Sequence, residues 1–380
     1  MGGFKEVTTA DISVLTDLVQ NTLNNLPWDG SWELCLNQPD YPVAAILNDD
    51  HIKSEGGKSI QKQIVLNYNF NQAANRTLYQ TDVPAAPQMM NTIIVPWCFT
   101  GVNWSYDKNE LAMNSGSKAG FIDLIEQKRV DAMIQLAELY ETNGWVAPIS
   151  AADTTTPYGI PYYLPFAANG FVGNGFSGQT VRYQNGTIGT LVAGIDASVQ
   201  TKWNSFVGTY AKVDNALIRL IRSATRKTNF KFPKMVKNPG EDYSRVDSDE
   251  GLYASEAIVT ELEDYAYKNG DNMAPARELT GRIGFTEDGV TFSGVPLRYA
   301  PTLDTETVVN TAGTTVNPAS IYMVRWGAIQ PTVLTDMWNV ESVSAITPFQ
   351  HTVISCFLDS TYNLVIRNRR SAGFHLHLAL

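Results

Sequence analysis

Cysteine and charged residues are both scarce in this chain of 380 residues. Its three cysteines, Cys35, Cys98 and Cys356, lie far apart without paired spacing, so we expect reduced thiols in a cytoplasm rather than a disulfide framework or a zinc site. Only 17% of the residues are charged while 44% are hydrophobic. This composition excludes a disordered chain and allows a substantial core in one or two domains.

Long apolar runs and an excess of basic residues are also missing. No stretch approaches about 18 consecutive apolar residues, so we expect no membrane-spanning helix. Residues 1–6 lack the basic-then-apolar pattern of a signal peptide. The formal net charge of −10 argues against nucleic-acid binding over the whole surface, because phosphate contacts need clustered lysine and arginine.

The short motifs predict no catalytic, cofactor or metal site. Residues 173–178 have the glycine spacing of a dinucleotide loop but lack its flanking strand and helix, so we interpret them as a mobile loop. Ser115 and Lys118 form the Ser-x-x-Lys motif of serine acyl-transfer enzymes, but a helix cap with a surface lysine is the preferred interpretation. His375 and His377 share one side of an extended segment without a nearby Cys, Asp or Glu, so an ordinary chain terminus is favoured over a metal pair.

The charges are distributed unevenly over the middle of the chain. Residues 219–237 contain seven basic residues and no acid, whereas residues 241–264 contain nine acids and one arginine. A block of one sign can contact nucleic acid, but neither interleaved aromatic residues nor a known motif supports that reading here. Docking between identical subunits, basic face against acidic face, is the favoured alternative.

Hydrophobic periodicity predicts a long amphipathic helix over residues 117–144, directly after an extended arm. At 1.5 Å per residue this helix is about 40 Å long and needs a broad packing surface, so we interpret it as a structural spine. Three further helices are expected, at residues 8–26, through 203–221 and at 255–268. A long hairpin is expected from the runs at 60–68 and 92–106. Strands are expected at 290–299, 320–326, 352–358 and 362–367, and the last two should form a hairpin around residues 359–361. The fold class is α+β, with mixed or antiparallel strands.

Several segments carry a family resemblance through their order along the chain. They are Glu55-Gly56-Gly57, Val95-Pro96-Trp97, Asn103-Trp104-Ser105-Tyr106, Lys118-Ala119-Gly120-Phe121-Ile122-Asp123-Leu124-Ile125, Arg129-Val130-Asp131-Ala132-Met133, Thr156-Pro157-Tyr158-Gly159-Ile160-Pro161-Tyr162, Gly294-Val295-Pro296-Leu297, Gln350-His351-Thr352-Val353 and Tyr362-Asn363-Leu364-Val365 with Arg367-Asn368-Arg369-Arg370. In this order they resemble the major capsid proteins of tailed bacteriophages, which have the Hong Kong 97-type fold. The resemblance covers about residues 50–373.

The resemblance implies a division of the chain into mechanical parts. The implied parts are an N-terminal arm (1–54), an extended β-hairpin loop (55–113), a peripheral domain with the spine helix (114–160), an axial domain (161–339) and return strands of the peripheral domain (340–380). The implied function is self-assembly as hexamers and pentamers into an icosahedral phage head that encloses double-stranded DNA, built in the host bacterial cytoplasm. Eight charged residues are the candidate assembly contacts: Glu55, Lys62, Arg76, Arg129, Arg226, Lys227, Arg367 and Arg369.

The resemblance also implies partners. A scaffolding protein, a portal and a decoration protein are expected beside the chain itself, with loose inner-surface contact to packaged DNA and no membrane. No charged helical prefix is visible, so scaffolding is expected from a separate protein or from none, and no motif selects a lysine–asparagine pair for a covalent crosslink. Three alternatives stay open: an encapsulin-like cellular compartment, a DNA-binding structural protein and a serine acyl-transfer enzyme using Ser115 and Lys118.

Overall fold

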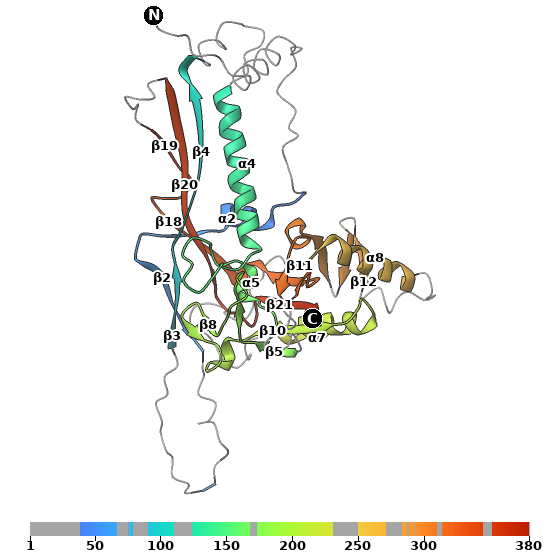
Figure 1. Cartoon of the computed structure of the whole chain (residues 1–380). Helices are drawn as coiled ribbons and strands as arrows, with labels where there is room; N and C mark the ends of the chain where they lie inside the picture. The colour runs from blue at the N-terminus through green and yellow to red at the C-terminus, as the bar shows by residue number, and fades with distance from the viewer. Residues whose placement is uncertain are drawn as a thin grey trace, which may run out of the picture. The chain divides into compact units, whose positions relative to one another are not determined.

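A computed structural model describes residues 39–66, 75, 77–78, 90–109, 124–167, 173–230, 250–270, 283–286, 289–292, 294–309, 314–344 and 352–379 (Figure 1). The chain forms two compact units. The smaller unit comprises Met1–Pro39, Thr100–Glu138 and Asn339–Ser360, and the larger unit comprises Asp40–Phe99, Leu139–Trp338 and Thr361–Leu380. Three elements run through both units, namely β4 (Cys98–Asp107), α4 (Leu124–Gly144) and β20 (Val353–Ile366).

An eight-stranded mixed sheet forms the centre of the larger unit. Its order is β12 (Ile283–Thr286), β13 (Gly289–Phe292), β14 (Val295–Tyr299), β11 (Glu250–Ala254), β17 (Ile321–Arg325), β21 (Gly373–Leu378), β10 (Ser205–Tyr210) and β5 (Asn174–Gly178). The β11–β14 and β10–β21 pairs are parallel, and the other pairs are antiparallel. This mixed sheet agrees with the predicted α+β class.

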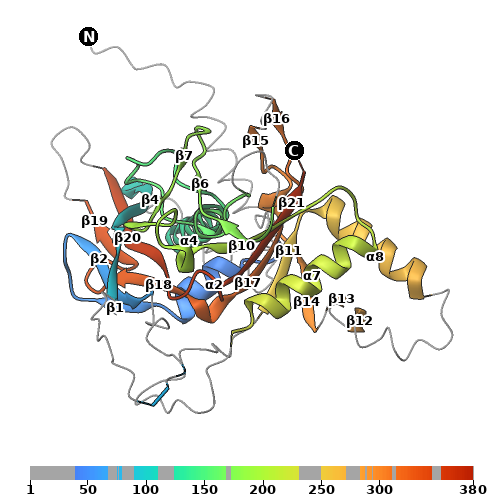
Figure 2. The same ribbon diagram turned by 90° about the horizontal axis from the view of Figure 1, so that it is seen from below.

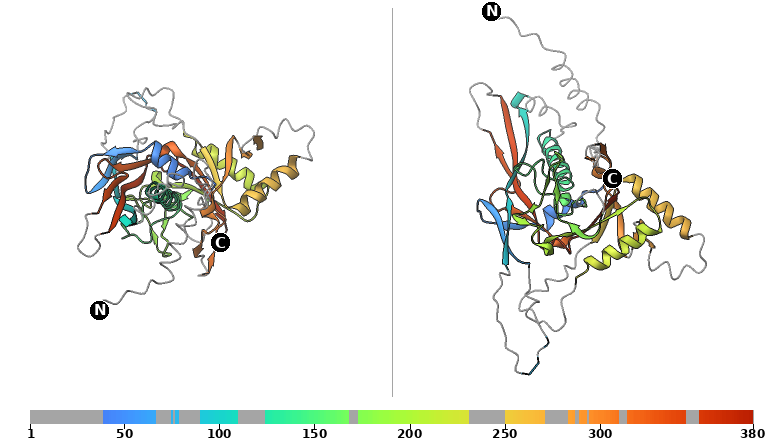
Figure 3. Two further views of the ribbon diagram at one scale, coloured as in Figure 1. Left: turned by 90° about the horizontal axis from the view of Figure 1, so that it is seen from above. Right: turned by 60° about the horizontal axis from the view of Figure 1, so that its bottom comes forward.

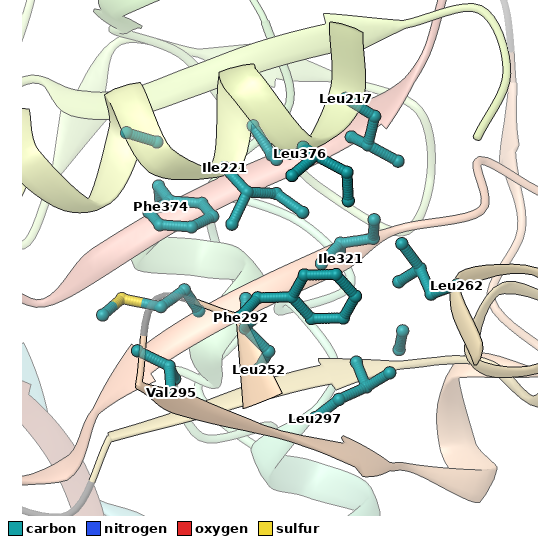
Figure 4. Packing of buried hydrophobic residues seen from close by; sticks show 14 of the residues in the cluster. Leu217, Ile221, Leu252, Leu262, Phe292, Val295, Leu297, Ile321, Phe374 and Leu376 are labelled. Carbon is teal, nitrogen blue, oxygen red and sulfur yellow. The ribbon is translucent and has the colours of Figure 1, made fainter. Parts of the chain in front are cut away.

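Two helices pack on this sheet, α7 (Asn215–Thr228) and α8 (Glu256–Gly270). Figures 2 and 3 show α7 and α8 lying beside each other along the strands. In Figure 4, Leu217 of α7 and Leu262 of α8 point toward Phe292, Ile321 and Phe374 of the sheet. All five side chains are almost fully buried, and burying one such side chain contributes about 1.5–3 kcal/mol.

A second sheet is built around the long strand β20. In the larger unit, its C-terminal half pairs antiparallel with β18 (Ile329–Leu334), and β1 (Ile52–Ser54) adds to β18 in parallel. In the smaller unit, its N-terminal half pairs antiparallel with β19 (Val340–Val343).

The predicted hairpin is confirmed over residues 59–65 and 90–96, but the rest of its second run, residues 98–106, belongs to β4, which pairs with β20. β2 (Ser59–Val65) and β3 (Met90–Pro96) pair antiparallel along their whole length, from Ser59 opposite Pro96 to Val65 opposite Met90. The remaining described elements are α2 (Pro42–Asp49), α5 (Ile160–Tyr163), β6 (Val181–Arg182) with β7 (Ile188–Gly189), β8 (Leu191–Val192) with β9 (Ile195–Asp196), β15 (Val308–Val309) with β16 (Thr315–Val316), and the 3-10 turns Thr201–Trp203, Pro301–Leu303 and Trp326–Ala328.

The helix predicted through residues 203–221 is wrong in its first half. Residues 205–210 form β10, and α7 begins only after Asp214, whose carboxylate accepts hydrogen bonds from the Ala216 and Leu217 amides at 2.8 and 3.2 Å. The strand is buried on both faces, so it shows no polar alternation, and its aromatic and β-branched residues favour an extended backbone. The third predicted helix is confirmed as α8.

The hairpin predicted around residues 359–361 is also wrong, because β20 is one continuous strand of 14 residues. The Ser360 hydroxyl donates to Asn339 Oδ1 at 2.9 Å, and the Thr361 amide donates to the Met337 carbonyl at 2.7 Å. Both residues are buried, so pairing along the strand outweighs their local turn preference. Residues 174–178, predicted as a mobile loop, form the edge strand β5 instead.

The predicted spine helix is confirmed where the structure describes it, as α4 over residues 124–144. Its expected start at residues 117–123 and the helix expected at 8–26 lie outside the described residues.

Candidate assembly surfaces

The base of the β2–β3 hairpin is fixed to the larger unit. Gly56 and Gly57 precede it with φ angles of 150° and 112°, a backbone that favours glycine, and the Trp97 indole N–H donates to the Gly57 carbonyl at 2.8 Å. The Ile94 amide donates to the Ala193 carbonyl at 2.9 Å. Ile60, Ile93 and Val95 are buried in a core cluster, so this part of the hairpin has a core.

Lys62 and Arg367 are two candidate assembly residues that the structure brings together. The Lys62 ammonium donates to Gln330 Oε1 at 2.9 Å, and burial together with the nearby charge of Arg367 lowers the pKa of Lys62. Glu55 is exposed at the turn before the hairpin. Arg76 lies outside the described residues.

Arg129 lies in the smaller unit, in the part of α4 that this unit contains. Its guanidinium forms an ion pair with Glu341 Oε2 at 3.0 Å, between the helix α4 and the strand β19. Both side chains remain partly exposed, so the pair is worth only about 0–1 kcal/mol to the single chain. β19 is exposed along its whole length.

Arg226 and Lys227 lie exposed in the last turn of α7. The position is favourable because cations stabilise the negative C-terminal end of a helix dipole. The Lys227 ammonium lies 5.8 Å from the centre of the Phe206 ring. Arg226 therefore extends the basic surface of α7, whereas Lys227 also contacts the sheet beneath the helix.

Arg369 is the candidate whose position disagrees with a surface role. Its side chain is 0% exposed, and its guanidinium donates to the carbonyls of Tyr163 at 2.6 Å and Trp203 at 3.2 Å. Burial lowers the pKa of Arg369 to about 9. Because it connects segments of its own chain, Arg369 is a core residue, and we leave it out of the proposed assembly contacts.

His375 and His377 lie on the buried strand β21 and not in an ordinary terminus. His375 Nδ1 is 3.1 Å from the Pro165 carbonyl and Nε2 is 3.0 Å from the Ser320 hydroxyl, while His377 bonds to the Leu378 carbonyl and the Ala167 amide. Burial lowers the pKa of both rings, to about 4 for His377. Since both nitrogens of each ring are already bonded, neither histidine is available to a metal ion.

The sequence did not predict two carboxylates that are shielded from water, the half-buried Glu306 and the buried Glu141. Glu306 accepts a hydrogen bond from the Tyr322 hydroxyl at 3.0 Å, and burial raises the pKa of Glu306 to about 7. Glu141 of α4 accepts from the Val43 and Ala44 amides and from the Trp145 indole, and burial raises its pKa to about 7 as well. Their hydrogen-bond partners lie up to 98 residues away in the sequence, so no local residue spacing predicts either carboxylate.

The described residues hold no group of three or more histidine, cysteine, aspartate or glutamate side chains placed to bind a metal ion. Cys98 and Cys356 are free thiols, while Cys35, Ser115 and Lys118 lie outside the described residues. Among the helices that the structure describes, none has the length and apolar character needed to cross a membrane.

No protein-family model matches the sequence, and no curated protein matches it either. Solved capsid structures do resemble it. The cyanophage A-1(L) capsid asymmetric unit aligns over 93% of this chain and 96% of its own, with 13% identity and a TM-score of 0.59. The capsid of a native GTA particle aligns over 93% and 96%, with 10% identity and a TM-score of 0.52. The mature capsid of bacteriophage PhiM1 aligns over 94% and 91%, with 11% identity and a TM-score of 0.50.

These likenesses concern the backbone, because the identities are low. They show that the chain has the α+β, Hong Kong 97-like capsid fold of tailed-phage major capsid proteins, as predicted from the order of its sequence segments. The alignments extend over nearly the whole of both chains, so the shared fold is not a single shared domain.

Proposed function

We propose that this chain is a major capsid protein that assembles as hexamers and pentamers into an icosahedral phage head enclosing double-stranded DNA. The observation that carries the proposal is the near full-length likeness to the cyanophage A-1(L) capsid chain. A fold can serve several functions, but a likeness over more than nine-tenths of both chains supports a role that uses the whole fold.

The features of the single chain support an assembling protein. Phe99, the second residue of β4, is 74% exposed, and Val65, Met90 and Ile94 of the hairpin are exposed as well. Val65 and Met90 lie opposite each other in the hairpin, and exposed apolar side chains that are neighbours can mark an interaction surface. With Arg369 left out, seven charged residues remain as proposed assembly contacts: Glu55, Lys62, Arg76, Arg129, Arg226, Lys227 and Arg367.

The composition suits a container for DNA. A net charge of −10 disfavours tight binding of packaged DNA, so the proposed contact with DNA is loose and confined to local basic surfaces. The proposed location is the virion, after assembly in the host bacterial cytoplasm. The proposed partners beside the chain itself are a scaffolding protein, a portal and a decoration protein. We also propose the five-part division of the chain that the resemblance implies, from the N-terminal arm (1–54) to the return strands (340–380).

A structural, non-enzymatic role fits the capsid fold. The serine acyl-transfer alternative predicts that a β-lactam acylates Ser115 in a small, monodisperse protein. The capsid proposal predicts an inert serine in a large particle. Mass spectrometry after β-lactam treatment distinguishes the two, and S115A provides the matched control because it removes the nucleophile without changing a charge.

The function is tested by expressing the chain alone and with the products of neighbouring genes, followed by gradient sedimentation. We expect fast-sedimenting closed particles or flat hexameric sheets. Particles made with the packaging proteins should protect double-stranded DNA from nuclease, whereas an encapsulin-like shell would enclose protein cargo and no DNA. A chain that sediments only as one or two copies under every condition would contradict the proposal.

A further inference from the structure

The helix α7 presents one positively charged flank. Leu217, Ile221 and Ala224 are buried toward the sheet, while Arg219 and Arg226 are exposed seven residues apart. Seven residues are two helical turns, so these two guanidinium groups lie on one flank about 10 Å apart along the axis. Arg222 has the intermediate position on the same flank, and α7 contains no acidic residue.

The helix α8 presents a negatively charged flank with the same spacing. Ile258, Leu262 and Ala266 are buried toward the sheet, while Glu256 is exposed and Glu263 is half-buried. These two glutamates are also seven residues apart, so they lie on one flank with the same separation of about 10 Å. Asp304 fixes the start of this helix, because its carboxylate accepts a hydrogen bond from the Glu256 amide at 2.9 Å.

Within the part of the chain that the structure describes, these charges are not neutralised. Arg219, Arg226, Glu256 and Glu263 form no ion pair with any residue that the structure describes. Both helices lie on the same face of one sheet, within the larger unit and over one shared core cluster (Figures 2 and 4). Both helices therefore pack on one shared core, which presents two complementary charge patterns within the same unit.

From this arrangement we infer that α7 of one copy docks against α8 of a neighbouring copy, with Arg219 and Arg226 facing Glu256 and Glu263. The inference rests on the proposed capsid function and names one contact within it. The charges indicate a second copy of this chain as the partner, because each copy carries both a basic pair and an acidic pair of side chains with the same separation.

Such a contact is head-to-tail, since the two helices that meet are different. Head-to-tail contacts generate closed rings when the rotation between copies closes, and a ring repeats the contact once per copy. Exposed ion pairs contribute little singly, so their main effects are to orient approaching copies and to repel misplaced ones. Added salt should therefore slow assembly.

The inference is tested by reversing each flank and then both. The basic-flank variant is R219E/R226E, the acidic-flank variant is E256R/E263R, and the swapped variant carries all four substitutions and keeps the composition of the wild type. All four side chains lie outside the packed core, and thermal unfolding of the unassembled chains checks that folding is retained. Particle yield is measured by gradient sedimentation and electron microscopy at low salt.

We expect each single-flank variant to lose at least tenfold in particle yield, because like charges then face each other across every contact. The swapped variant should recover most of the yield and should not co-assemble with the wild type. K53E/K202E, which makes the same change in net charge at exposed positions outside α7, should assemble normally.

Wild-type yield from both single-flank variants would overturn the inference and leave the capsid proposal intact. So would a folded swapped variant that fails to recover. Normal shells of R219E/R226E that have lost only their nucleic acid would assign the basic flank to DNA and also overturn it. Absence of particles from the wild type would instead contradict the proposed function.

Discussion

Glu141 is buried in the larger unit, where its carboxylate lies at the first turn of α2. Glu141 Oε2 accepts from the Val43 and Ala44 amides at 2.8 and 3.1 Å, and Oε1 accepts from the Trp145 indole at 2.6 Å. A carboxylate at a helix N-terminus is stabilised by the unpaired amides there, but desolvation opposes ionisation more strongly and raises its pKa from 4.5 to about 7.

The raised pKa of Glu141 predicts a pH-dependent stability. Because the folded chain holds this proton more tightly than the unfolded chain, the contribution is fully present below pH 4.5 and is lost as the pH rises to about 7. The loss is about 3 kcal/mol at most. Glu306 has a raised pKa of the same sign, so only a comparison between variants isolates Glu141.

E141Q removes the titrating group at this position. We expect the stability of E141Q relative to the wild type to increase by up to about 3 kcal/mol between pH 4.5 and above pH 7, measured by denaturant unfolding of the unassembled chain. W145F removes a donor that favours the ionised carboxylate, so it should move the midpoint to higher pH. Parallel pH curves for E141Q and the wild type would contradict this account.

At the level of secondary-structure elements, β21 depends on a glycine at its first position. Gly373 has a φ of 147°, and a Cβ added there would lie 1.8 Å from the Met323 carbonyl oxygen of β17. Since both strands lie in the middle of the eight-stranded sheet, the backbone cannot move aside without breaking the ladder.

G373A should therefore destabilise the chain by about 3 kcal/mol or more, as strain and a backbone clash combine. G186A is the matched control, because Gly186 also has a positive φ, of 83°, yet nothing lies within 4 Å of its added Cβ. We expect a cost of about 1 kcal/mol there, and thermal unfolding measures both. Equal costs for the two variants would show that the clash is relieved.

The start of α7 depends on the Asp214 carboxylate. D214A removes the acceptor of two backbone amides and should cost about 1 kcal/mol, whereas D214N keeps an acceptor and should cost only a few tenths. Chemical denaturation of the unassembled chain provides the comparison. If the two variants lose the same stability, the side chain does not act as the cap.

The sequence predicted the elements whose pattern is local. The amphipathic periods of α4 and α8 and the alternation of the β2–β3 hairpin were sufficient, because each element buries one side and exposes the other. β10 was missed because it is buried on both faces, and β20 was divided because residues 359–361 have turn propensity that its neighbouring strands override. Strand pairing of this kind cannot be predicted from a short window of sequence, because it depends on residues elsewhere in the chain.

The candidate residues divide in the same way. Arg226 and Lys227 follow a visible run of basic residues, and the structure places both on the exposed surface of α7. Arg369 belongs to a similar basic run, yet its guanidinium is buried against carbonyls of distant segments. The burial of Arg369, like that of Glu141, depends on contacts with residues far away in the sequence. Residue spacing along the chain therefore could not predict it.

At the scale of the whole molecule, the proposed assembly explains features that a single chain leaves unsatisfied. Exposed apolar side chains on the hairpin and charged flanks on α7 and α8 cost little in one copy but are repeated throughout a closed shell. Repetition allows weak contacts to act together, so no single interface needs a large free energy.

The central claim is tested most directly by cryo-electron microscopy of the particles formed when the chain is expressed with its neighbouring gene products. The account predicts a closed icosahedral shell in which this fold is repeated in hexamers and pentamers. A reconstruction with no closed shell, or a shell whose density does not accommodate this chain, would contradict it.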